Sequence, residues 1–189
     1  MITPSQRLEY LINVYFGNTD DDYISSAVNR AYLDFSRTQR GFGSNTEKKQ
    51  IHEKRVSWLN TEIASLLNRR CANQIQFDKV HKKIMKGLIA RSQFGFSYGQ
   101  AQKWVNMSLK YCLVIRPEAS SLNEKYFHVP IDNLLTDILS AEGYKKFPNI
   151  GTWSKMTDYR KYSTFQKWFR HTFDGEYPIR AELRLWKRV

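Results

Sequence analysis

Two short segments carry the residues best suited to chemistry. In residues 98–107 (YGQAQKWVNM), Lys103 stands just inside an expected helix, after a glycine-bearing turn. In residues 128–135 (HVPIDNLL), Asp132 stands at the expected N-cap of the next helix. The positive helix end and neighbouring cations favour a neutral, nucleophilic amine. A capping carboxylate stays ionised and can stabilise positive charge that develops on a sugar carbon. Together they predict attack on the sugar of a nucleotide flipped out of nucleic acid.

Each residue also has a simpler interpretation when it is taken alone. Most helix lysines are exposed and only solvated, and an aspartate at a helix start is often no more than a cap. The catalytic hypothesis depends on finding both in this order, at this spacing, on a basic helical chain.

The spacing of apolar residues predicts an all-α protein, and the length of the chain favours one domain over residues 1–189, or two small lobes that share a cleft. The stretches between residues 116 and 127 and between 143 and 153 are expected to be loops. A loop is also expected at residues 41–45, followed by a long helix that ends at residue 70. The other expected helices span residues 5–16, 20–35, 76–91, 99–115, 132–141 and 158–172, and a last one begins at residue 178.

The segment from about residue 76 to 115 is expected to form a helix-hairpin-helix unit. Its turn should present backbone N–H groups beside a positive helix end, a geometry that binds a DNA phosphate without reading sequence. Trp153 is the best candidate for stacking on a base, and His128 either lines the cleft or bonds to backbone. The full set of DNA- or base-binding candidates is Gly95, Ser97, Gly99, Gln100, Gln102, His128, Trp153 and Lys155.

The charge balance indicates the partner. Thirty Lys and Arg face 18 Asp and Glu, which favours a polyanion, most often nucleic acid. No apolar run is long enough to cross a membrane and the first residues do not form a signal peptide, so a cytoplasmic, nucleoid-associated protein without a membrane partner is expected. Cys71 and Cys112 stand outside any zinc-like cluster. The sequence therefore predicts no metal, no cofactor and no protein partner, and a monomer.

The same motifs resemble those of the helix-hairpin-helix DNA glycosylase superfamily. Its signature is the hairpin, a catalytic lysine on the second helix and a Val-Pro-Val-Asp-like segment, which residues 128–132 match well. Residues 103–111, with a second lysine at Lys110, look most like the archaeal 8-oxoguanine glycosylase branch. The resemblance covers about residues 76–145. Three residues lie between Gly95 and Gly99, whereas one residue lies between the two hairpin glycines of the family. No iron–sulfur cysteine loop follows.

The resemblance implies a two-lobed helical fold, Lys103 in the position of the Schiff-base lysine, and Asp132 as the catalytic aspartate of a helix at about 130–142. The implied activity is a DNA N-glycosylase that excises an 8-oxoguanine-like purine or a phage-type modified cytosine, in repair or in defence. Whether it also nicks the abasic strand stays open. The alternatives are a non-catalytic helix-hairpin-helix DNA-binding protein and a helical RNA-binding protein or ribonuclease.

Overall fold

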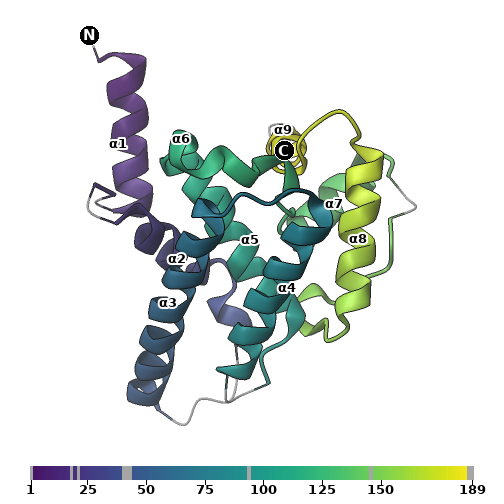
Figure 1. Ribbon diagram of the computed structural model, residues 1–189, viewed down its shortest axis with the longest axis horizontal. Coiled ribbons are helices and arrows are strands. Elements are labelled where there is room, and N and C mark those ends of the chain that lie inside the picture. The colour runs from purple at the N-terminus through teal and green to yellow at the C-terminus, as the bar shows by residue number, and fades with distance from the viewer. Residues whose placement is uncertain are drawn as a thin grey trace.

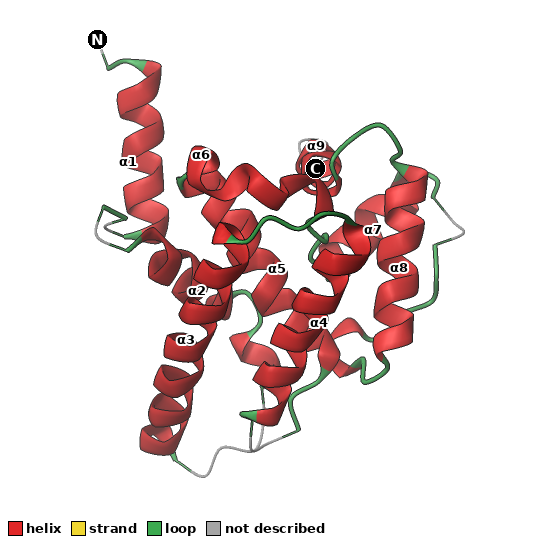
Figure 2. Ribbon diagram, viewed as in Figure 1, coloured by secondary structure: helices red, strands yellow, loops and turns green. Residues whose placement is uncertain are grey.

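The computed structural model describes residues 2–17, 19–20, 22–39, 44–92, 95–144 and 147–186. Within these ranges the regular structure is entirely helical, and no strand occurs (Figure 2). The all-α prediction is thus confirmed. Across the same residues, no helix combines the length and apolarity that crossing a membrane requires.

The helices begin and end close to their expected positions. The loop expected between residues 116 and 127 instead forms two short helices, because Pro117 starts a helical turn readily at its first position. Residues 41–43 of another expected loop lie outside the described residues. The elements are α1 (Pro4–Phe16), α2 (Tyr23–Leu33), η1 (Ser36–Thr38), α3 (Asn45–Asn68), α4 (Gln74–Ala90), α5 (Tyr98–Ile115), α6 (Pro117–Ser120), η2 (Ser121–Tyr126), α7 (Asn133–Ala141), η3 (Trp153–Lys155), α8 (Tyr159–Thr172) and α9 (Pro178–Trp186).

Side-chain caps fix several helix starts. The carboxylate of Asp22 accepts the N–H of Ser25 at 2.9 Å, so α2 starts later than predicted, with an acid at its N-cap. Asp132 caps α7 in the same way, as the sequence predicted. Among the described residues, no group of His, Cys, Asp and Glu side chains is arranged to hold a metal ion.

Helix α5 runs through the middle of the molecule, with α2, α3, α4 and α8 around it (Figure 1). Every residue from Gly99 to Cys112 is buried, so Val105, Leu109 and Cys112, which recur at helical spacing, form only one of its buried faces. A helix buried on all sides is normally apolar, yet α5 carries several polar side chains. Burial of such groups is costly unless each finds a partner, and the partners of α5 define the candidate site.

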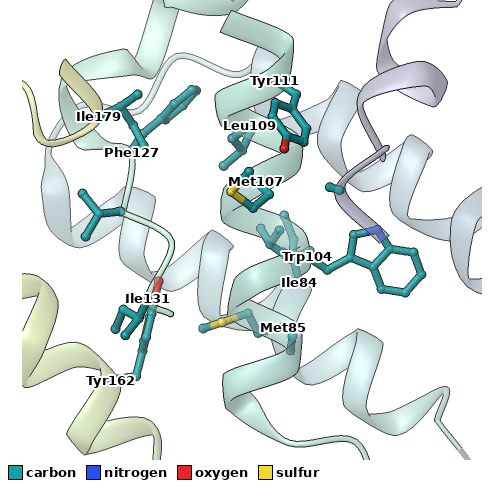
Figure 3. Packing of buried hydrophobic residues seen from close by; sticks show 14 of the residues in the cluster. Ile84, Met85, Trp104, Met107, Leu109, Tyr111, Phe127, Ile131, Tyr162 and Ile179 are labelled. Atoms are coloured by element: carbon teal, nitrogen blue, oxygen red, sulfur yellow. The ribbon is translucent and has the colours of Figure 1, made fainter. Parts of the chain in front are cut away.

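Aromatic side chains pack on opposite sides of α5. Figure 3 shows Trp104 on one side, and Ile131 and Tyr162 on the other. Trp104 is fully buried and donates its indole N–H to the carbonyl of Val28 at 2.9 Å, which ties α5 to α2. On α8, the aromatic residues Tyr162, Phe165 and Phe169 recur at helical spacing and are all inaccessible to solvent.

Candidate active site

The two residues singled out by the sequence meet in the structure. The amine of Lys103 donates a hydrogen bond to Oδ2 of Asp132, although 29 residues separate them along the chain. The side chain of Lys103 is 5% exposed and that of Asp132 is 17% exposed. Lys103 is therefore not the solvated helix lysine of the simpler interpretation, and the carboxylate is the more accessible member of the pair.

The cap geometry divides the two oxygens of Asp132 between two tasks. Oδ1 accepts the backbone N–H of Leu135 at 2.8 Å, which fixes the carboxylate at the start of α7. Oδ2 is then the atom that faces Lys103. A carboxylate held at a helix N-terminus is oriented before any substrate arrives.

The extended segment before Asp132 is held by two glutamine side chains. The amide of Gln102 on α5 donates to the carbonyl of Ile131 at 2.7 Å and accepts its N–H at 3.0 Å. Gln166 on α8 pairs in the same way with Val129, at 2.8 and 3.0 Å. These two clamps replace the backbone partners that a strand would provide. The two clamps fix the position of Asp132 along the axis of α5.

A buried chain of hydrogen-bonded polar groups from α4, α5 and α8 contacts the same segment at His128. His128 donates to Asp78 at 2.8 Å and accepts the hydroxyl of Tyr162 at 2.6 Å. Asn106 donates to that hydroxyl oxygen at 3.1 Å and accepts a hydrogen bond from His81 at 2.7 Å. Each group along this chain donates towards Asp78. The donating nitrogen is therefore Nε2 in both histidines, and Nδ1 of His128 accepts the hydroxyl of Tyr162.

Burial controls the ionisation of this polar chain. It lowers the pKa of His81 to about 3, assisted by the nearby charge of His128. Burial also lowers the pKa of His128 itself. For Asp78, burial acts to raise the pKa, but the hydrogen bond from His128 and nearby positive charge outweigh it and hold the pKa at about 2. Around neutral pH the two imidazoles are therefore neutral and Asp78 is ionised.

More ionisable groups surround the Lys103–Asp132 pair. Asp34, at the end of α2, accepts the hydroxyl of Tyr111 at 2.8 Å, and burial raises the pKa of its carboxyl above the ordinary value. The charges of Lys103 and Asp132 both act on Asp34, in opposite directions. The pair thus has a second carboxyl group close by, supplied by a different helix.

A second buried ion pair lies two turns further along α5. Lys110 donates to both carboxylate oxygens of Glu182 on α9, at 2.8 and 2.6 Å. Burial raises the pKa of Glu182, while the charge of Lys110 acts against that rise. The sequence carries a signal for the buried carboxylate: Glu182 stands three residues from both Ile179 and Leu185, inside a buried helical stripe.

The turn before α5 differs from the expected phosphate-binding hairpin. Gly95 has a φ of 63°, which suits the predicted glycine turn. The N–H of Gly99, however, donates to the carbonyl of Met156 at 3.0 Å, and the N–H of Gln100 donates to Ser97 at 3.1 Å. The start of α5 is thus already capped by the protein itself, and these N–H groups do not serve as phosphate donors in this arrangement.

The other predicted binding residues have mainly structural contacts. The amide of Gln100 donates to Thr38 at 3.0 Å, and the hydroxyl of Ser97 donates to the carbonyl of Ser154 at 2.6 Å. Trp153 is 9% exposed and packs in the core, so it presents little surface to a base. Lys155 is exposed. Of the predicted set, the structure therefore brings Gln102 and His128 to the Asp132 segment and leaves Lys155 on the surface.

Basic side chains gather on the surfaces of two helices. Helix α4 exposes Lys79, Lys83 and Lys86. Lys82 on the same helix lies over the ring of Tyr159 at 4.1 Å, which joins α4 to the start of α8. Helix α8 in turn exposes three further basic side chains, Arg160, Lys161 and Lys167.

Comparison of the chain with protein families, with curated proteins and with solved structures found no match. The assignment of this site therefore depends on its own chemistry. An amine and an oriented carboxylate in contact can exchange a proton, and together they can supply a nucleophile and stabilise positive charge on a carbon between them.

Proposed function

We propose that this protein is a DNA N-glycosylase that removes a damaged or modified base from a flipped nucleotide. The observation that carries the proposal is the direct contact between Lys103 and Asp132. A nucleophile and its partner carboxylate must lie within hydrogen-bonding reach of each other for the chemistry to work. The helix-cap geometry and the two glutamine clamps support it, because they orient Asp132 without relying on the lysine.

In the proposed reaction, the bond between the base and C1′ of the deoxyribose breaks. Its electron pair leaves with the base, which takes up a proton, and positive charge develops on the sugar. Asp132 stabilises that charge, because a carboxylate in a poorly hydrated site acts strongly at short range. The lone pair of an incoming nucleophile then forms the new bond to C1′.

The nucleophile is either the amine of Lys103 or a water molecule. If the amine attacks, the ammonium group loses two protons: one goes to the departing base, and one goes to O4′ when the C1′–O4′ bond breaks and the nitrogen lone pair forms the C1′=N bond. The resulting imine allows β-elimination and strand cleavage. If water attacks, the product is an intact abasic site. Borohydride reduction distinguishes the two routes, because it converts only a lysine imine into a permanent covalent complex.

In this proposal the DNA backbone contacts the basic helices. The exposed lysines of α4 and the basic residues of α8 provide charge that neutralises phosphates, so binding should weaken as salt rises. The segment comprising α4, residues 91–97 and α5 takes the place of the helix-hairpin-helix unit. Because the backbone N–H groups at the start of α5 are already hydrogen-bonded within the protein, the proposed phosphate contacts are made by the basic side chains of α4 and α8.

Two features weigh against the alternatives. A binding protein without catalysis has no need of a lysine and an aspartate in a shared site, and a separation well over about 10 Å with no pocket would favour that alternative; the two side chains are in contact. A ribonuclease usually requires a histidine that can exchange protons near a phosphate. His81 and His128 are buried within the polar chain and neutral near pH 7.

The proposal is tested with Lys103→Gln and Asp132→Asn. Oxidised, alkylated and phage-derived DNA are incubated with each protein, and released bases are identified by mass spectrometry. Wild type should release one class of base, and each variant should lose about 100-fold or more in rate while still binding the DNA. Lys54→Gln, at an exposed position on α3, is the control and should keep the full rate. Wild-type rates in both folded site variants would refute the assignment.

A further inference from the structure

Helix α1 carries an apolar surface that nothing in the described chain covers. None of its residues is buried, and Leu8, Tyr10, Leu11 and Val14 are 58%, 67%, 54% and 65% exposed. Single exposed apolar residues are common on soluble proteins, but a group of this size on one short helix is not. Figure 1 shows α1 extending away from the rest of the molecule.

The helix is attached to the body only near its C-terminal end. The hydroxyl of Tyr15 lies 3.2 Å from that of Tyr111 and accepts a hydrogen bond from Arg30 at 2.6 Å. Phe16 places its ring 5.0 Å from the ring of Tyr111, edge to face. A helix of 13 residues is marginal in water by itself. The free part of α1 therefore needs a partner surface more than a well-packed helix does.

The exposed apolar residues share one side of α1. At about 100° per residue, Leu8, Tyr10, Leu11 and Val14 fall within an arc of roughly 160°. We refer to these four residues as the α1 stripe. The polar residues Gln6, Glu9 and Asn13 lie on the opposite side, whereas Arg7 falls within the arc of the stripe, between Val14 and Leu11. This is the pattern of a helix that packs against another apolar surface.

We propose that the α1 stripe pairs with the α1 stripe of a second copy of this chain. In an antiparallel arrangement with the two-fold axis at Leu11, that residue contacts its own counterpart. Leu8 then faces Val14 of the other copy. Arg7 lies opposite Tyr15, whose ring already has the guanidinium of Arg30 over one face, 4.0 Å from its centroid. Such a contact is closed and self-complementary, as in most homodimers.

Surface area and charge both favour a second copy over other partners. The stripe and its neighbours offer on the order of 500 Å² per copy, so a dimer buries about 1,000 Å² in total, near the lower limit for specific association. Within α1 the charged residues are Arg7 and Glu9, whose charges cancel, in a chain of net charge +12. Phosphate backbones and anionic membranes therefore gain no attraction from this helix.

The net charge predicts how the dimer responds to salt. Two copies of charge +12 repel each other, and added salt screens that repulsion. Apolar contacts between the stripes are not weakened by moderate salt. Dimerisation should therefore strengthen as salt rises, whereas binding to DNA weakens.

The test is sedimentation velocity on the full chain between about 1 and 100 μM, a range chosen for a weak contact at the low end of interface sizes. Wild type should change from monomer to dimer across this range. Leu11→Glu should stay monomeric, since it places two carboxylates at the two-fold axis, and it should keep its fold because the position is exposed. Leu122→Glu, at a residue 42% exposed on η2, is the control and should dimerise like wild type. Leu11→Cys should form a dimer linked by a disulfide on oxidation.

Three outcomes would overturn the proposal. Wild type that remains monomeric throughout the range would show that the stripe does not pair. A dimer in Leu11→Glu as strong as in wild type would place the interface elsewhere. Monomeric wild type that sediments with neutral phosphatidylcholine vesicles, when Leu11→Glu does not, would assign the stripe to membranes.

Discussion

Single polar side chains inside α5 determine where the proposed catalytic groups lie. Gln102, Lys103 and Asn106 are buried, and each has its polar atoms paired with a residue outside the helix. An apolar residue at any of these positions would pack, but it would leave a backbone or charged group of the partner segment without a partner. The polar side chains of Gln102, Lys103 and Asn106 therefore hold the segment of residues 128–132 in one place relative to α5.

Replacing Gln102 by Met should show this positioning effect. Methionine has a similar size, so the loss is that of three hydrogen bonds: two to the backbone of Ile131 and one that Gln102 accepts from the amide of Asn106. The free energy of unfolding should fall by about 1–3 kcal/mol, measured by urea denaturation. Base release should also slow by about tenfold or more, because a small shift of Asp132 spoils its alignment.

The control for this variant is Gln50→Met, at an exposed position on α3. It should leave both the stability and the rate unchanged. If Gln102→Met unfolded at the same urea concentration as the control, the clamp would contribute nothing measurable.

His81 predicts a loss of stability in mild acid. Its pKa is about 3 in the folded protein, below the ordinary value of 6.5, because burial disfavours the charged ring. Above pH 6.5 its contribution is complete. As pH falls from 6.5 towards 3, the unfolded chain binds a proton that the folded chain does not, and stability decreases. Each pKa unit of difference is worth about 1.4 kcal/mol.

Melting temperatures between pH 7.5 and about 4.5 would check this prediction. His128 and His52 have pKa values shifted in the same direction by burial, so wild type should lose stability steadily. His81→Gln keeps a donor towards Asn106 and cannot titrate, so its melting temperature should fall less steeply. Parallel curves for the two proteins would show that His81 does not bind the extra proton on unfolding.

At the scale of elements, the close contact of α5 with η3 sets the position of the site. A Cβ built on Gly99 would lie 1.6 Å from the carbonyl oxygen of Trp153, a backbone atom that cannot rotate away. The N–H of Gly99 donates to Met156 in the same segment. Only glycine allows the start of α5 to approach so closely.

Gly99→Ala should therefore be strongly destabilising, by about 2 kcal/mol or more, as an overpacked contact is. Gly87→Ala is a matched control, because it is also a helical glycine and its Cβ meets the outer edge of the Trp58 ring, a side chain that can move. The gain in helix propensity should offset part of its cost. Thermal unfolding of the two variants compares them directly. Equal losses would mean that the segment at 153–156 moves freely.

The sequence predicts elements well where the signal is local. Cap residues such as Asp132, helix breakers such as Gly143 and apolar spacing located most of the helices. The central position of α5 could not be predicted, because its polar residues resemble a surface face until their partners are known. Those partners lie far along the chain: Gln166 with Val129, Lys110 with Glu182, and Met156 with Gly99. Contacts of this kind depend on the tertiary arrangement.

At the scale of the whole molecule, the charge is on the surface and the proposed chemistry is inside. The exposed lysines of α4 and α8 belong to the outer surface, whereas Lys103 is a buried residue of the central helix and Asp132 contacts it from the start of α7. In the proposed function, a nucleotide leaves the duplex to reach these two residues, as in enzymes that flip a base out of the stack. The composition predicted a polyanion partner, but it could not predict this division between surface and interior.

The most direct test of the account is whether Lys103 and Asp132 act as one unit. Single-turnover release of the base is measured for wild type, Lys103→Gln, Asp132→Asn and the double variant on the same DNA. Residues that share a step are not additive, so the double variant should lose no more than the slower single variant. Losses that multiply in the double variant, or a full rate in either single variant, would show that the two residues do not share the reaction.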